Sequence, residues 1–194
     1  MNDLNDKRVL ALVEGCKKND RASQKMLYEH FYAFAMRICQ RYSSGPDEAI
    51  EIMNDGFMKV FTKISKFDAN LSLVGWIRRI MVNTAIDYYR KNKKYRLNSN
   101  LDDVDETKLL IEPAGVPVLS RIAYEDLIKL VQKLSPAYRA VFNMYVVDGY
   151  NHKEIAEKLK ITEGASKSNL SKARERMKRL LKIFYHEEYA KYTG

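Results

Sequence analysis

The 194-residue chain has few of the residues that build metal sites and disulfide frameworks. It contains two cysteines, Cys16 and Cys39, and three histidines, His30, His152 and His186, which are scattered without the spacing of metal ligands. Two cysteines supply neither a disulfide framework nor a Cys-rich metal site. The sequence therefore predicts no metal and no cofactor.

Long hydrophobic runs are also absent. No run approaches the roughly 20 apolar residues that a membrane-spanning helix needs. The N-terminal apolar patch at residues 9–13 follows acidic residues and is too short for a signal peptide. We therefore expect a cytoplasmic protein without membrane insertion.

No stretch shows a convincing β-strand pattern, and the apolar spacing predicts an all-α chain. The expected helices span residues 6–18, 20–42, 47–64, 73–94, 120–134 and 136–148, followed by a helix-turn-helix. Asp20 and Ser135 stand at capping positions, with Pro136 at the first helical position. In the second helix the residues expected to face inward are Met26, Leu27, Phe31, Phe34, Ala35 and Ile38.

Residues 97–118 separate two helical regions. This stretch is acidic, lacks a consistent helix or strand period, and holds Pro113, Gly115 and Pro117. We interpret it as a flexible acidic linker between two small helical domains, at residues 1–96 and 120–194, with residues 97–119 as the linker.

Charge is distributed unevenly along the chain. The formal net charge is +9 with a pI near 9.4, which favours attraction to phosphate but is also compatible with a solvated surface. Residues 76–96 carry seven cations and one acid, residues 97–120 one cation and five acids, and residues 162–184 seven cations and two acids. Two basic blocks on either side of an acidic spacer indicate two sites.

Residues 150–170 have the spacing of a DNA-reading helix-turn-helix. Ile155 and Leu159 share one face of a short first helix, and Ile161 and Thr162 occupy the turn and the cap of the next. The second helix has an apolar stripe and an opposite face with Lys167, Lys172, Arg176 and Arg179. A basic face of this kind suits the major groove, although an ordinary helical hairpin with a solvated face is the alternative. Ser166 departs from the motif, because a buried aliphatic residue usually stands there.

The helix from residue 73 interleaves aromatic residues with cations. Trp76, Asn83 and Asp87 recur at helical spacing, with Arg79 and Arg90 on nearby turns. Such a pattern holds unstacked bases while gripping the phosphate backbone. The preceding loop, residues 67–72, adds a polar pocket candidate that begins with an aromatic residue. The alternatives are core packing for Trp76 and a local polar contact for Asn83.

The helix from residue 47 begins with four carboxylates, those of Asp47, Glu48, Glu51 and Asp55. A metal-dependent nuclease would use such a cluster, but acids in a first turn also favour the helix dipole, and no histidine accompanies them. The interpretations left open are a solvated face and an acidic and apolar docking surface for a protein partner.

Three segments together resemble the extracytoplasmic-function (ECF) sigma factors of bacterial RNA polymerase. Residues 51–61 (EIMNDGFMKVF) are similar to the family's polymerase-docking segment, and residues 66–91 (KFDANLSLVGWIRRIMVNTAIDYYRK) to its −10-element reader. Residues 133–142 (KLSPAYRAVF) and the helix-turn-helix resemble its −35-element reader. Asn54 in place of the usual Gln, Gly56 within the docking helix, and Ser166 depart from the family pattern.

The resemblance implies a protein that binds core RNA polymerase and guides it to promoters. The residues that it places against the polymerase clamp helices are Glu51, Ile52, Asn54, Asp55 and Phe57. The residues that it places at the −10 element are Phe67, Asn70, Trp76, Arg79, Asn83, Arg90 and Lys91. Those for the −35 element are Lys167, Ser168, Asn169, Lys172 and Arg176.

Two other functions compete with this one. A stand-alone helix-turn-helix regulator with an N-terminal sensing domain would explain the C-terminal half, but it needs no basic helix led by a tryptophan. A helical nuclease is more distant, since no catalytic constellation is visible, and we expect no enzyme activity and no small-molecule substrate. An anti-sigma factor is an expected further partner. The linker acids, Asp102, Asp103, Asp105 and Glu106, suggest either a strand lying in a basic polymerase channel or a solvated tether.

Overall fold

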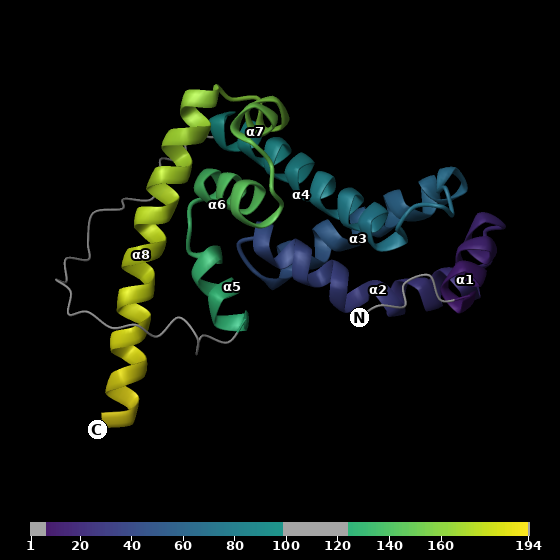
Figure 1. Cartoon of the computed structure of the whole chain (residues 1–194), viewed down its shortest axis with the longest axis horizontal. Coiled ribbons are helices and arrows are strands. Elements are labelled where there is room, and N and C mark those ends of the chain that lie inside the picture. The colour runs from purple at the N-terminus through teal and green to yellow at the C-terminus, as the bar shows by residue number, and fades with distance from the viewer. Residues whose placement is uncertain (1–6, 99–123, 194) are drawn as a thin grey trace. The chain divides into compact units, whose positions relative to one another are not determined.

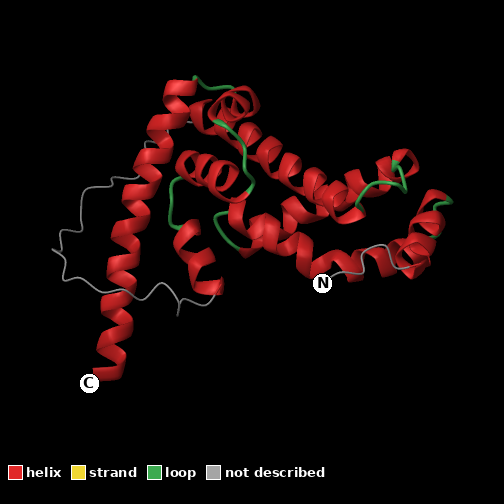
Figure 2. Ribbon diagram, in the orientation of Figure 1, coloured by secondary structure: helices red, strands yellow, loops and turns green. Residues whose placement is uncertain are grey.

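The computed structural model describes residues 7–98 and 124–193, with side chains from residue 8 to 93 and from 124 to 184. Every element within these ranges is helical, as Figure 2 shows, which confirms the predicted all-α fold. The helix expected over residues 73–94 continues to Asn98, so the predicted linker does not begin at residue 97. The rest of the predicted linker, residues 99–119, and the predicted helix start at residue 120 lie outside the described residues. The chain divides into two compact units, with the division between Tyr88 and Tyr89. The predicted domain end at residue 96 stays a prediction.

The first unit contains α1 (Lys7–Lys17), α2 (Arg21–Tyr42), α3 (Pro46–Lys63), a 3-10 turn (Ile64–Lys66) and the start of α4 (Leu73–Asn98), coloured purple to teal in Figure 1. Asp20 caps α2 as predicted, because its carboxylate accepts from the Ser23 backbone N–H at 2.8 Å. The hydrogen bonds from Ser23 also hold the pKa of Asp20 below its usual value.

The core of the first unit follows the stripe Leu27, Phe31, Ala35 and Ile38 of α2, which packs against α1 and α3. Phe34 is half-buried. The prediction that Met26 faces inward is wrong, since 55% of this residue is exposed. One residue step turns a helix by about 100°, so the position before Leu27 points away from the core.

A glycine allows α3 to approach α4 closely. A Cβ atom at Gly56 would lie 2.3 Å from Met81 Sδ, and Met81 is itself fully buried. The glycine that departs from the family pattern therefore leaves room for the Met81 side chain between the two helices.

The second unit contains α5 (Tyr124–Gln132), α6 (Pro136–Phe142), a π-helical turn (Asn143–Val147), α7 (His152–Leu159) and α8 (Glu163–Thr193). Ser135 and Pro136 start α6 as predicted, and the expected helix to residue 148 is divided into α6 and the π-helical turn. Its main apolar core consists of Leu130, Val131, Leu134, Ala173, Met177 and Leu180.

Two features of the described part of the chain bear on its chemistry. No helix there is long and apolar enough to cross a membrane. The same residues contain no group of three or more His, Cys, Asp or Glu side chains placed to hold a metal ion.

Candidate nucleic-acid interface

The acidic side of α3 presents three of the five predicted docking residues to solvent: Glu51, Asn54 and Asp55. Two of them also connect α3 to its neighbours. The Tyr88 hydroxyl of α4 donates to Glu51 Oε2 at 2.8 Å, and the Tyr28 hydroxyl of α2 donates to Asn54 Oδ1 at 3.3 Å. The docking candidates are therefore held on a packed scaffold.

The other two predicted docking residues, Ile52 and Phe57, lie in the core. They are 1% and 2% exposed, and the Phe57 ring lies 4.6 Å from the Tyr28 ring. These two side chains are therefore not exposed to a partner in this structure, and their contact with the polymerase stays a prediction. They alternate with the exposed acids because α3 packs one face inward, and their role is to hold that face in place.

Phe67 also lies in the core, at the loop before α4. This predicted base-capturing residue is 4% exposed, and its ring centroid lies 5.2 Å from that of Trp76. Trp76 is half-buried. The two rings form a hydrophobic contact at the start of α4. Of the two, Trp76 alone leaves part of its ring open to a ligand.

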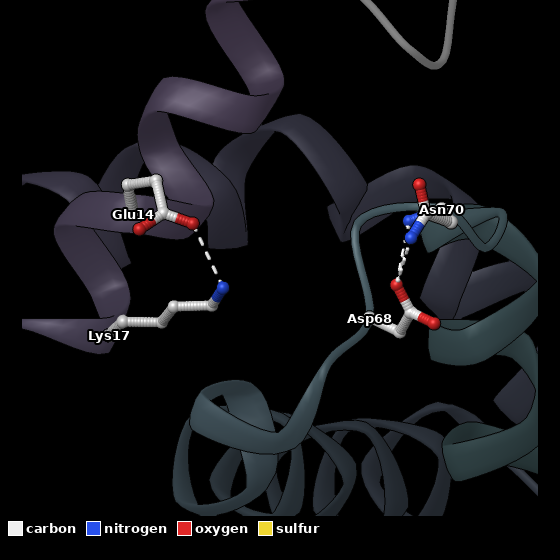
Figure 3. A network of polar contacts seen from close by, with 4 residues as sticks. All are labelled: Glu14, Lys17, Asp68 and Asn70. Carbon is white, nitrogen blue, oxygen red and sulfur yellow. Dashed lines mark hydrogen bonds and ion pairs between the residues drawn. The ribbon is translucent and has the colours of Figure 1, made fainter.

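The loop before α4 exposes Asn70. Asp68 Oδ1 accepts hydrogen bonds from the backbone N–H and the side-chain Nδ2 of Asn70, both at 2.9 Å. Figure 3 shows the amide oxygen of Asn70 turned away from Asp68, so the side chain is oriented with an acceptor facing outward. An oriented amide of this kind can read a base edge. The other pair in the figure, Glu14 and Lys17, is a local ion pair within α1.

Four predicted −10 residues share one side of α4. At about 100° per residue, Trp76, Arg79, Asn83 and Arg90 fall within an arc of about 60°. Arg79 is exposed, while Asn83 and Arg90 are half-buried. Lys91 is exposed and lies one position further around the helix. The acid near this side, Asp87, pairs with Lys59 of α3 at 3.2 Å, which reduces its repulsion of phosphate.

The helix-turn-helix forms as predicted. Asn151 and Glu154 make a capping box that starts α7. Lys160 ends α7 in the left-handed conformation, with φ 53° and ψ 53°. Thr162 then caps α8, because its Oγ1 accepts from the Ala165 backbone N–H at 3.0 Å. Hydrogen bonds therefore define both helix starts of the motif.

The first half of α8 separates buried from open residues. Its apolar stripe includes Leu170, Ala173 and Met177, which are buried. Of the predicted −35 residues, Lys167, Ser168 and Lys172 are exposed, whereas Asn169 and Arg176 are half-buried. The predicted cations do not form one narrow stripe: Lys167 and Arg176, nine positions apart, lie about 180° apart around the helix. Ser168 and Lys172 lie between them, on the side opposite the core.

Comparison with known families decides the identity. Residues 27–95 match the family model "Sigma-70 region 2", and residues 124–177 match "Sigma-70, region 4". Together the two models cover more than half of the chain. The chain is similar to the ECF RNA polymerase sigma factor SigW of Bacillus subtilis, with 25% identity over 177 residues, which covers 88% of this chain and 95% of SigW. The chain is an ECF sigma factor.

Other similar proteins are also described as sigma factors. RNA polymerase sigma factor SigZ of Bacillus subtilis is 28% identical over 149 residues, covering 75% of this chain and 78% of SigZ. Among solved structures, the sigma factor RpoE in complex with the anti-sigma factor NepR from Bartonella quintana matches at 24% identity with a TM-score of 0.47, covering 82% of this chain and 96% of that one.

Membership settles the class of activity. The protein is a promoter-recognition subunit of RNA polymerase, which binds core polymerase and promoter DNA, and it is not an enzyme. The alternative function, a stand-alone helix-turn-helix regulator, is excluded, because the sensing domain of a regulator would not match region 2. The sequence resemblance to ECF sigma factors is confirmed.

One polar contact of the sigma factor was missed from the sequence. Ser166 is 0% exposed, and its Oγ lies 2.9 Å from Nδ1 of His152, the first residue of α7. The serine thus replaces an apolar contact of the motif with a hydrogen bond. Its signal in the sequence was a histidine at the first position of α7 together with a hydroxyl residue at the end of the first turn of α8.

Proposed function

We propose that the exposed acidic face of α3, formed by Glu51, Asn54 and Asp55, docks this sigma factor on the clamp helices of core polymerase. Each of these side chains is open to solvent, and two accept hydrogen bonds from neighbouring helices, so the face is both accessible and fixed. Two carboxylates on an ordered surface favour a basic partner surface, and charge complementarity gives such an interface its specificity.

The side of α4 that carries Trp76, Arg79, Asn83 and Arg90 is proposed to contact the −10 element. This gathering within an arc of about 60° is the observation on which the proposal rests. The arginines and Lys91 would hold phosphates, and the amides of Asn83 and Asn70 would read an unpaired base. Phe67 would support Trp76 without contacting DNA itself, since its buried ring packs against the indole.

The start of α8 is proposed to lie in the major groove of the −35 element. Lys167, Ser168, Asn169 and Lys172 lie in its first three turns, where a recognition helix reaches base edges. Arg176 lies further along and half-buried, which suits a phosphate contact. We also propose that the protein acts in the cytoplasm and that an anti-sigma factor regulates it.

In-vitro transcription with core polymerase and a promoter library tests these roles. Replacing Glu51 and Asp55 with Lys should abolish transcription and core binding, because like charges at an interface cost several kcal/mol. Tyr88→Phe removes the hydrogen bond to Glu51 without changing the charge and should leave both nearly intact. The matched control, Glu14→Lys with Glu29→Lys, makes the same change of charge on exposed acids of α1 and α2. If the control abolishes core binding as well, the docking face is not specific.

The same assay tests the −10 assignment. With all four bases at each −10 position, Asn83→Ala should relax the preference at one position by about 1–3 kcal/mol, the value of a bidentate amide contact to a base edge. A uniform loss at every position would mean that Asn83 is structural.

A further inference from the structure

The otherwise apolar contact between α7 and α8 includes one directional interaction, a hydrogen bond. Ile155 and Leu159 of α7 and Leu170 of α8 are buried, as in any small helical motif. Ser166 is buried among such residues, but its Oγ is bonded to His152 Nδ1 at 2.9 Å. Apolar contacts allow helices to slide and rotate, whereas a hydrogen bond weakens steeply away from its preferred distance and angle.

The imidazole of His152 is held on another side as well. Its ring lies nearly parallel to the Tyr145 ring of the π-helical turn, with centroids 4.6 Å apart and planes at 26°. The Arg174 guanidinium lies over the same tyrosine ring, 5.7 Å from its centroid. The contacts therefore run from Ser166 through His152 and Tyr145 to Arg174, and begin and end on α8.

This chain of contacts grips α8 at two points. Ser166 and Arg174 are eight residues apart, which is about 12 Å along the helix axis. Lys167, Ser168, Asn169 and Lys172 lie between them in the sequence. Contacts at two separated points restrain both the tilt and the rotation of the segment between them, whereas one point restrains neither completely.

We propose that His152 and Ser166, supported by Tyr145, are positioning residues that set the orientation of α8 for reading the −35 element. The inference rests on the proposed function of α8 and adds residues that touch no DNA. Loss of the bond leaves the fold in place, because the apolar contacts remain, but it lets the base-reading side chains move relative to the groove. A shift of that kind weakens a matched promoter more than a mismatched one.

The test uses the full-length protein with core polymerase on two promoters that differ only in an intact or scrambled −35 element. The measured quantity is the ratio of transcription from the two. His152→Leu and Ser166→Val remove the bonding atoms while keeping apolar bulk, and each should lower the ratio about five- to tenfold, the size of one buried hydrogen bond. The double variant should lose no more than either single variant, since the same bond is lost once.

Rescue by a conservative variant separates positioning from packing. An Asn at position 152 places an amide near the site of Nδ1 but loses the ring stacked on Tyr145, so His152→Asn should recover part of the ratio, to a value between those of His152→Leu and wild type. Tyr145→Phe keeps the stacking ring and should leave the ratio unchanged, whereas Tyr145→Leu should lower it. Thermal unfolding of each variant identifies loss of folding.

The outcomes distinguish two failures. If wild-type transcription ignores the −35 element, the proposed function of α8 is overturned and this inference with it. If wild type depends on the element and His152→Leu or Ser166→Val leaves the ratio unchanged, only the inference is overturned. Additive losses in the double variant, or no rescue by His152→Asn, would likewise overturn it.

Discussion

Where α3 packs against α4, the sigma factor has a glycine, Gly56, at a position where a side chain would collide with its neighbour. In the turn between α7 and α8 it has a lysine, Lys160, at a position where glycine would be less strained. The Cβ position of Gly56 is occupied by Met81, and Lys160 has a positive φ of 53°. A methyl group at position 56 would require the end of the Met81 side chain to move within a buried core, whereas a residue in the left-handed conformation costs about 1–2 kcal/mol. The glycine thus leaves room for the Met81 side chain in the core, and the absence of a glycine is tolerated at an exposed turn.

The difference extends to how the two proposed DNA helices are supported. The α4 helix is tied to α3 by close packing, by the Lys59–Asp87 ion pair and by the Tyr88–Glu51 hydrogen bond. Besides its apolar contacts with α7, the start of α8 is held by the turn at Lys160, the Thr162 cap and the part-buried Ser166–His152 hydrogen bond. We therefore expect changes in the α3–α4 core to affect folding first, and changes around the α7–α8 turn to affect promoter reading first.

The largest effect should come from removing a buried side chain from the core around α3. Phe57→Ala should destabilise the first unit by about 3–5 kcal/mol, because it leaves a cavity beside Tyr28 and Phe61. Denaturant unfolding followed by the fluorescence of Trp76 measures this, since Trp76 is the sole tryptophan and lies in the first unit.

The neighbouring Met58, 67% exposed, provides the control for Phe57. Met58→Ala should change the stability of the first unit by less than about 0.5 kcal/mol. A small stability loss in Phe57→Ala together with lost core binding would restore Phe57 as a docking contact.

A smaller effect should come from Gly56→Ala. The new methyl group meets buried Met81, so the first unit should lose about 1–3 kcal/mol despite the better helix propensity of alanine. Gly75→Ala in α4 is the matched control, because its Cβ would lie 3.6 Å from Ser72, an ordinary contact. The same fluorescence assay compares them, and equal stabilities would show that Met81 moves aside freely.

Much of the fold was predictable from local signals. The cap at Asp20, the Ser135–Pro136 start of α6 and the Thr162 cap were read correctly because each depends on residues within three positions. The apolar stripe of α8 was also correct, since one helical period determines it.

Apart from Met26, whose exposure follows from the helical period, the differences concern contacts between separate segments of the chain. Ile52, Phe57 and Phe67 were expected at interfaces, and their burial depends on where α2 and α4 pack against them. The role of Gly56 depends on Met81, 25 positions further along, and that of Ser166 on His152, 14 positions earlier. Single-sequence periodicity describes one face of one helix and contains no information on its neighbours.

The smallest effect is expected at Lys160, in the turn between α7 and α8. Lys160→Gly should stabilise the second unit by up to about 1 kcal/mol, because glycine adopts a positive φ without the Cβ clash, while its greater freedom in the unfolded chain offsets part of the gain. Lys160→Ala removes the charge but keeps the Cβ atom, so it should give no gain. Hydrogen exchange of the α7 and α8 amides follows this unit separately from the first.

Lys160 is exposed, and its backbone N–H bonds to carbonyls of α7 in a way that glycine preserves. Transcription from a promoter with an intact −35 element should therefore be unchanged in Lys160→Gly. A stabilised variant with weakened −35 reading would show instead that the strained turn itself orients α8.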